Sequence, residues 1–326
     1  MRKEVSVYNN LIDLYEKNVF ELSPEAVLHF FHRVYITNGN KKYTKMIATG
    51  VYIKYIKEFE LLVSKLDVKD YNLRDSSKKL KKMGERQRKR KNYYKSHPEI
   101  HFFNRLFLCL FYIKKFNLHQ GCRKDSFIKA INLLKKIDFK NIYLSDEAIK
   151  GDSSYLFNSV VFMKQLGVNS ALENQCIQRL RDLYIDSDLN IKNNLDESEF
   201  QSLIYSLTHI IIADSRFYER FVFSYDWIID VFIKNLEEIE KRVTFDILSE
   251  IAFCLRLTQQ SKRHEKEYKL LKKNLLKMIQ FYKLNNDITY LKFKEHTNSI
   301  LILLFGAYKD FEKPVNLSKN KLFSNQ

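Results

Sequence analysis

Three polar side chains interrupt otherwise apolar helical segments, and their types suit proton transfer or ligand binding. His209 lies within SLIYSLTHIIIAD, Glu250 within FDILSEIAFCLRL, and His296 near the start of EHTNSILILLFGAY. A buried polar group without a partner costs about 1–3 kcal/mol, so each of these side chains requires a hydrogen-bond partner or a ligand. They are separated by roughly one helical hairpin each, so hairpins stacked in register would bring all three to one cavity.

The chemistry of this set has three interpretations. A histidine oriented by Glu250 can act as a general acid or base. Two imidazoles and a carboxylate are also ligand types for zinc or ferrous iron. A third interpretation is a structural His–Glu hydrogen bond that joins neighbouring hairpins. The three residues are far apart in sequence and form no local metal motif, so the sequence names no cofactor and assigns no metal ligand.

Further polar residues occur in comparable positions. Asp214 and Tyr218 directly follow the predicted His209 helix, so we expect both at the rim of a cavity. There the Asp214 carboxylate could bind an arginine or a sugar hydroxyl, and the Tyr218 hydroxyl could donate a proton. Asn158 interrupts the apolar segment SSYLFNSVVFMKQLG one hairpin earlier. In the N-terminal segment LHFFHRVY, His29 and Arg33 are additional candidates. The simpler interpretation of the Asp214–Tyr218 segment is capping and loop packing.

The elements that must position these residues alternate between two kinds of helix. Helices that are apolar nearly all round are typical of complete burial, and they are predicted at 101–113, 155–166, 202–213, 246–257 and 297–308. Amphipathic helices, with apolar residues three and four positions apart, are predicted at 125–136, 172–184, 225–241 and 265–282. This alternation predicts an all-α array of helical hairpins. An α/α toroid is favoured over an open HEAT-like solenoid, because a solenoid leaves one helix layer wet along one side.

The N-terminal third is predicted to contain helices at 5–17, 24–35 and 42–66, followed by a basic segment. Residues 78–95 contain ten Lys or Arg residues and one Glu, about half of the net charge of +17. We expect a single domain, 1–326, with a basic insertion or linker at about 69–97. A solvated helix end or loop is the simpler interpretation of this run, and contact with nucleic acid phosphates is the alternative.

Composition excludes several classes of protein. Seven Gly and three Pro in 326 residues disfavour sandwiches, barrels and glycine-rich nucleotide folds. Cys109, Cys122, Cys176 and Cys254 show no zinc-ligand spacing. No secretory signal is visible and the apolar runs are too short to span a bilayer, so a cytoplasmic location is expected.

The order of four segments resembles an uncharacterised bacterial family called domain of unknown function 3541. These segments are SLIYSLTHIIIADSRFYER, YDWIIDVF, FDILSEIAFCLRL and EHTNSILILL. The resemblance covers most of the chain outside the basic run, with Cys254 and Arg256 as departures, and it implies no assigned activity. The positions that match its motifs are His209, Asp214, Tyr218, Trp227, Glu250, His296 and Asn298.

Together these observations predict an enzyme or binding protein that acts on a glycan, a peptide or a small molecule in a polar central cavity. The expected catalytic residues are His209, Glu250, His296, Tyr218 and Asp214. The expected substrate-binding residues are Asn158, Trp227 and Asn298. The alternative is a non-catalytic helical-repeat interaction protein that contacts nucleic acid through the basic run.

Overall fold

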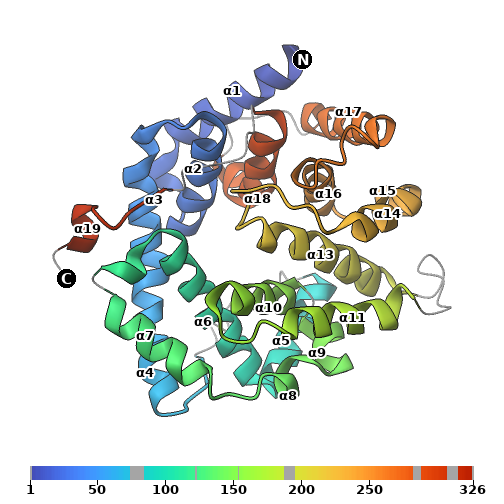
Figure 1. Cartoon of the computed structure of the whole chain (residues 1–326). Coiled ribbons are helices and arrows are strands. Elements are labelled where there is room, and N and C mark those ends of the chain that lie inside the picture. Colours follow the sequence, from blue (N-terminus) through green and yellow to red (C-terminus); the bar gives the residue numbers. More distant parts are fainter. Residues whose placement is uncertain are drawn as a thin grey trace. The chain divides into compact units, whose positions relative to one another are not determined.

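The computed structural model describes residues 2–73, 84–121, 123–152, 154–186, 195–281, 288–306 and 315–324. Within these ranges the regular elements are helices and none is a strand, which confirms the all-α prediction (Figure 1). Across the same ranges, no helix combines the length and the apolar character needed to cross a membrane. The chain divides into two compact units, so the single domain and the toroid stay predictions.

Unit 1 comprises Met1–Lys54 and Asp214–Val315. Its central helix is α18 (Ile288–Phe305), which packs against α1 (Arg2–Lys17), α2 (Pro24–Asn38) and α16 (Phe245–Leu257) (Figure 1). The other helices of this unit are α3 (Thr44–Val51), α14 (Asp226–Lys234), α15 (Leu236–Arg242) and α17 (Glu265–Phe281). Helices from the two ends of the chain therefore share one core.

Local sequence signals explain the helix ends in unit 1. Ser23 caps α2 by accepting a hydrogen bond from the Ala26 amide at 3.2 Å, and Pro24 occupies the first turn. Gly39 ends the same helix with a left-handed φ of 66°. The helix predicted at 225–241 is instead two helices, because the chain breaks at Asn235, whose side-chain amide donates to the Val231 carbonyl at 2.8 Å.

Unit 2 comprises Tyr55–Ala213 and Asn316–Gln326. Helix α10 (Ser154–Leu166) packs against α6 (Pro98–Lys115) and α11 (Leu172–Tyr184), and α4 (Lys57–Asp67) packs against α6 and α7 (Lys124–Leu134). The other helices of this unit are α5 (Glu85–Ser96), α8 (Lys140–Tyr143), α9 (Asp146–Asp152), α13 (Glu197–Asp214) and α19 (Lys321–Ser324). The last residue of α13, Asp214, is the first residue of the second segment of unit 1. Most residues of α6, α10 and α13 are buried, as their all-round apolar patterns predict.

The basic run is helical where the structure describes it. Residues 78–83 lie outside the described part, and from Glu85 the chain forms α5. The Tyr94 hydroxyl donates to the Asp152 carboxylate, which also accepts from Asn104 Nδ2 at 2.6 Å. Gly151 permits close approach of α9, since a Cβ there would lie 2.8 Å from Tyr93 Cγ. The second half of the predicted insertion or linker is thus a helix fixed to α6 and α9.

Three of the four cysteines are core residues. Cys109, Cys176 and Cys254 are free thiols and are buried. Burial raises the pKa of Cys176 to about 12 and also raises that of Cys254. These thiols therefore stay protonated and unreactive at neutral pH. Cys122 lies outside the described residues.

Candidate functional site

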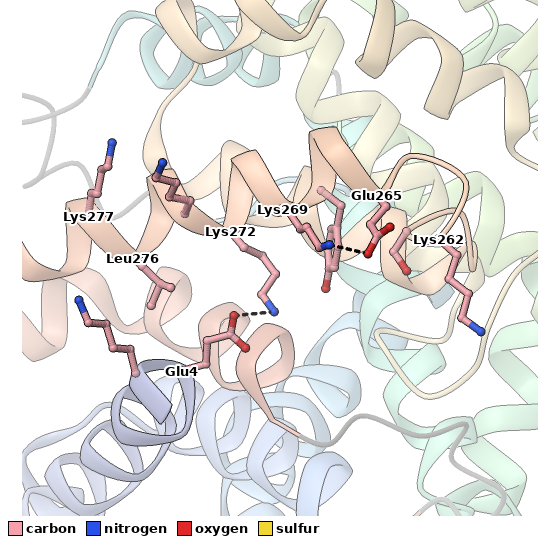
Figure 2. Close-up of a pocket in the computed structure, with 11 residues that line it drawn as sticks. Glu4, Lys262, Glu265, Lys269, Lys272, Leu276 and Lys277 are labelled. Atoms are coloured by element: carbon pink, nitrogen blue, oxygen red, sulfur yellow. Dashed lines mark ion pairs between the residues drawn. The ribbon is translucent and has the colours of Figure 1, made fainter. Parts of the chain in front are cut away.

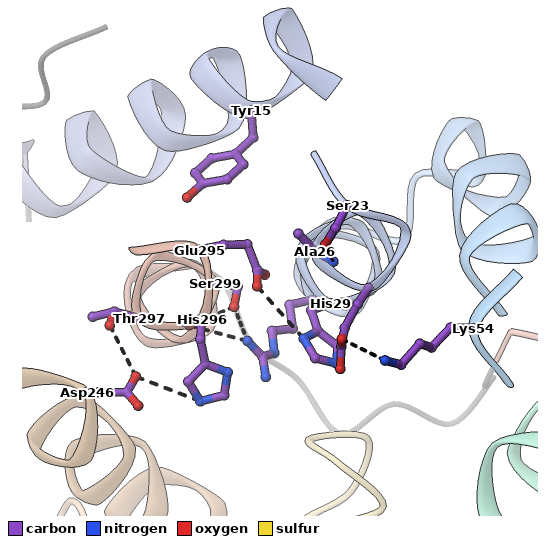
Figure 3. A network of polar contacts seen from close by, with 12 residues as sticks. Tyr15, Ser23, Ala26, His29, Lys54, Asp246, Glu295, His296, Thr297 and Ser299 are labelled. Atoms are coloured by element: carbon purple, nitrogen blue, oxygen red, sulfur yellow. Dashed lines mark hydrogen bonds and ion pairs between the residues drawn. The ribbon is translucent and has the colours of Figure 1, made fainter. Parts of the chain in front are cut away.

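The clearest constellation in unit 1 joins α16 to α18. Asp246 and Glu250 lie one turn apart on α16 and so project from the same face. His296 on α18 places Nε2 3.0 Å from Glu250 Oε1 and 3.8 Å from Asp246 Oδ1. The Thr297 hydroxyl donates to Asp246 Oδ1 at 3.1 Å, as Figure 3 shows. Two carboxylates therefore flank one imidazole.

Burial and charge give this imidazole an unusual proton affinity. The Glu250 side chain is fully buried, while 35% of the His296 side-chain surface is exposed. Desolvation lowers the pKa of His296, but the charge of Asp246 and the hydrogen bond to Glu250 raise it by more, to about 8. His296 is therefore mostly protonated at neutral pH. Its Nε2 is engaged by Glu250, while its Nδ1 makes no hydrogen bond within the described ranges.

A buried arginine contacts the backbone of His296, and its guanidinium lies over a buried tyrosine ring. The Arg33 guanidinium on α2 donates to Ser299 Oγ and, at 3.4 Å, to the His296 carbonyl. Its Cζ lies 4.9 Å from the centre of the Tyr218 ring. Burial raises the pKa of Tyr218 well above its usual value; the nearby Arg33 charge lowers it and the Glu250 charge raises it. Tyr218 thus remains a hydroxyl donor at every physiological pH.

The loop that carries Tyr218 has an unusual backbone. Arg216, Phe217 and Tyr218 have φ values of 54°, 52° and 73°. The left-handed region costs an L-residue roughly 1–2 kcal/mol. The Tyr218 amide donates to Ser215 Oγ at 2.9 Å, and Glu219 Oε1 lies 3.0 Å from His32 Nε2 on α2. Strain of this kind persists where surrounding contacts determine the conformation.

Further titratable side chains lie on α2 and α18 near His296. His29 Nδ1 lies 3.8 Å from Glu295 Oε2, and its ring centre is 6.5 Å from that of His296 (Figure 3). His29 and Arg33 were among the residues predicted from the sequence, whereas Asp246, Glu219 and Glu295 were not. The i,i+4 spacing to Glu250 could have revealed Asp246. Nothing in the local sequence distinguishes the other two from surface carboxylates.

His209 lies in unit 2 and has a different environment. Its Nδ1 is 3.0 Å from Asn158 Oδ1, and its ring centre is 4.3 Å from that of Tyr205. Because an amide oxygen only accepts, Nδ1 of His209 is assigned the proton. His209 is only 9% exposed and Asn158 only 7%. This pair has the geometry of a hydrogen bond within the core of unit 2.

The remaining predicted site residues have structural contacts in unit 1. Asp214 accepts from Arg220 Nη2 at 2.7 Å and from the Tyr225 hydroxyl at 3.1 Å, as loop packing requires. Asn298 donates to the Tyr15 hydroxyl at 2.9 Å. Trp227 is half-buried on α14. Glu250, His296 and Tyr218 thus form one group in unit 1, and His209 and Asn158 form another in unit 2.

The Asp246–Glu250–His296 cluster also has ligand types that hold divalent cations. One donor atom from each residue lies within 4.8 Å of the other two. Carboxylate oxygens and an imidazole nitrogen suit zinc or manganese. A metal binds only neutral imidazole, however, and the pKa of His296, raised to about 8, means that a proton competes with the metal at neutral pH. The cluster holds a proton more readily than its ligand types alone indicate.

Comparison with known proteins confirms the resemblance seen in the sequence. The model of the family described as "Domain of unknown function (DUF3541)" matches residues 4–324. The chain belongs to this family. Neither the curated proteins nor the solved structures provide a match to this DUF3541 chain. The matched range includes the Glu250–His296 pair and the Asn158–His209 pair, so both pairs belong to the family's domain.

A wide lysine-lined pocket lies elsewhere in unit 1 of this DUF3541 protein. It is bordered by α1 and α17, and Lys272 Nζ lies 2.9 Å from Glu4 Oε1 across it (Figure 2). A second ion pair joins Lys269 to Glu265 at 2.6 Å within α17. Six lysines and two glutamates line the pocket, so it is electropositive. The cluster around His296 does not contribute to its lining.

Proposed function

We propose that this DUF3541 protein is an enzyme in which His296 acts as a general acid, oriented by Glu250, on a glycan, a peptide or a small polar molecule. The observation that carries the proposal is a partly exposed imidazole 3.0 Å from a fully buried carboxylate. A histidine oriented by a second group is the common arrangement for general acid–base catalysis.

The hydrogen bond between His296 and Glu250 determines which imidazole nitrogen can transfer a proton to a substrate. Glu250 accepts from Nε2, so Nδ1 is the atom that can exchange a proton with a substrate. Protonated His296 would donate the Nδ1 proton to the leaving oxygen or nitrogen as a water molecule forms a new bond to the substrate and the bond to the leaving group breaks. The proton released by this attacking water would then return to the neutral imidazole, and the nearby carboxylates stabilise the imidazolium that forms again.

The neighbouring groups support this role by holding the imidazole in place. Asp246 adds a second negative charge beside His296 and is itself held by Thr297. Arg33 binds the backbone at His296 and the side chain of Ser299, which fixes the turn of α18. Tyr218, His209 and Asp214 were predicted from the sequence as catalytic residues, but they need no direct part in this chemistry.

The test compares substitutions in two His–Glu pairs. The full-length protein, Glu250→Gln and His296→Asn would be incubated with oligosaccharides, peptides and small esters, and products followed by mass spectrometry. We expect each variant to lower kcat about 100-fold or more, since general acid catalysis contributes about 10²–10⁴. The matched control is His97→Asn, because His97 Nε2 lies 3.4 Å from Glu147 Oε1 at the surface of unit 2.

A folded His296→Asn protein with the activity of the unmodified chain would overturn the proposal. The second candidate function, metal-assisted hydrolysis, is favoured only by the mutual proximity of the three donor atoms. Activity that is lost on chelation and restored by zinc or manganese would select this second candidate.

A further inference from the structure

A small pocket in unit 2, lined in part by the basic helix α5, contains cationic and hydroxyl side chains. Arg86, Lys89 and Arg90 line it from α5, and Ser154 and Ser202 line it from α10 and α13. Positions 86, 89 and 90 are three and four residues apart, so they share one face of α5. The whole lining includes four cationic side chains and one carboxylate, that of Glu199.

The two arginines are held by aromatic faces rather than by carboxylates. Arg86 Cζ lies 4.4 Å from the centre of the Tyr205 ring, and Arg90 Cζ lies 4.3 Å from that of Tyr155. Among the residues that the structure describes, neither guanidinium forms an ion pair, whereas Lys89 lies 3.0 Å from Asp196. Stacking orients a guanidinium and leaves its charge and its N–H donors available to a ligand.

A buried hydroxyl in the same pocket points to a ligand independently. Ser154 is only 1% exposed, and its Oγ has no hydrogen-bond partner in the described part of the chain. Arg86 Nη1 is buried without a partner in the same way. Buried donors of this kind are normally satisfied, because an unmade hydrogen bond destabilises the fold. A ligand with several acceptor atoms would satisfy both.

The helices that meet at the pocket add to its positive potential. Ser154 lies in the first turn of α10, and Ser198, which also lines the pocket, lies in the first turn of α13. Helix N-termini favour anions because their amide N–H groups point outward and the macrodipole is positive there. The Glu199 carboxylate accepts from the Asp196 amide at 3.2 Å, so it serves as part of the α13 cap.

We propose that this pocket binds the phosphate group of a small phosphomonoester. Two guanidinium groups, two ammonium groups and hydroxyl groups offer more donors than a planar carboxylate can accept, and they suit three terminal phosphate oxygens. The buried position of Ser154 favours a terminal phosphate. An internal phosphodiester, with a sugar on each side, cannot reach it as deeply. This site is independent of the acid–base function proposed for His296.

Binding would be measured by calorimetry on the full-length protein with inorganic phosphate and with glycerol 3-phosphate. We expect Arg86→Gln and Arg90→Gln each to weaken binding about 10-fold or more, since charge-assisted hydrogen bonds are strong. The matched control is Arg88→Gln, which removes the same charge from an exposed position of the same helix. Tighter binding of glycerol 3-phosphate would identify a phosphomonoester ligand, and equal binding would reduce the proposal to free phosphate.

Ser154→Ala separates a ligand-binding role from a structural one. We expect it to leave the phosphate-free midpoint of thermal unfolding unchanged or raised, and to diminish the rise in that midpoint caused by phosphate. Lowered stability without phosphate would assign Ser154 to the core and overturn its role. Absence of phosphate binding, or an equal loss with Arg88→Gln, would overturn the site. Stronger binding of a 5′-hydroxyl oligonucleotide than of its 5′-phosphorylated form would also overturn it and indicate a nucleic acid surface.

Discussion

His296 and His209 arise from similar sequence settings and have different chemical environments. Both lie on apolar helices, yet His296 pairs with a carboxylate and keeps 35% of its side chain exposed, whereas His209 pairs with an amide and is 9% exposed as a residue. A carboxylate partner raises proton affinity, and an amide partner mainly satisfies a buried donor. The partner and the exposure, more than the histidine, determine whether the position suits catalysis.

The largest expected effect is on stability, at the buried pair in unit 2. His209→Ala would leave a cavity and deprive Asn158 Oδ1 of its donor, so we expect the free energy of unfolding to fall by about 2–4 kcal/mol. Urea denaturation measures this change. His97→Ala, at a partly exposed pair, is the control and should change stability by about 0.5 kcal/mol or less. A loss below about 1 kcal/mol at His209 would contradict a core role.

A smaller effect is expected on the proton affinity of His296. Burial lowers the pKa of His296, and the charges of Asp246 and Glu250 raise it to about 8. Asp246→Asn or Glu250→Gln removes one of these charges, so each variant should lower the pKa of His296 from about 8. The double variant should bring it to the ordinary value of about 6.5 or below. Histidine ring signals followed by NMR during a pH titration give the value directly. Glu295→Gln is the control; a comparable fall there would show a general field effect rather than a specific pair.

The smallest effect is the pH dependence of stability. A folded pKa above the unfolded value means that the contribution of His296 is fully present below about pH 6.5 and is lost as pH rises through about 8. The shift corresponds to about 2 kcal/mol, which solvent screening of this one-third exposed group reduces to about 1 kcal/mol. Urea denaturation at pH 6 and pH 8.5 measures it. Unchanged pH dependence in Glu250→Gln would assign the effect to another group.

The sequence predicted the helices well, and the grouping of His209 with Glu250 and His296 stays a prediction. All-round apolar patterns located α6, α10, α13 and α16, because complete burial leaves a clear mark on composition. The break at Asn235 was missed because an Asn does not by itself interrupt an amphipathic pattern. The hydrogen bond from its side chain to the Val231 carbonyl is visible only in the structure. The basic run was assigned to an insertion or linker, since the anchoring of α5 depends on Asp152, which is distant in sequence.

The candidate site was predicted in part. The Glu250–His296 pair was among the interpretations, since hairpin spacing brings successive apolar helices together. His209 was grouped with this pair, whereas its hydrogen-bond partner is Asn158, in the preceding apolar helix. Spacing indicates which helices can be neighbours. It does not indicate towards which neighbour one side chain turns, because a rotation of about 100° per residue changes the face.

The left-handed loop at Arg216–Tyr218 has a consequence for natural selection. Glycine adopts such φ values without steric cost, so the backbone conformation alone would favour it at all three positions. This chain instead has Arg, Phe and Tyr there, with φ values of 54°, 52° and 73°. The side chains must therefore provide an advantage that exceeds the backbone cost, and the packing of Tyr218 against Arg33 identifies one such advantage.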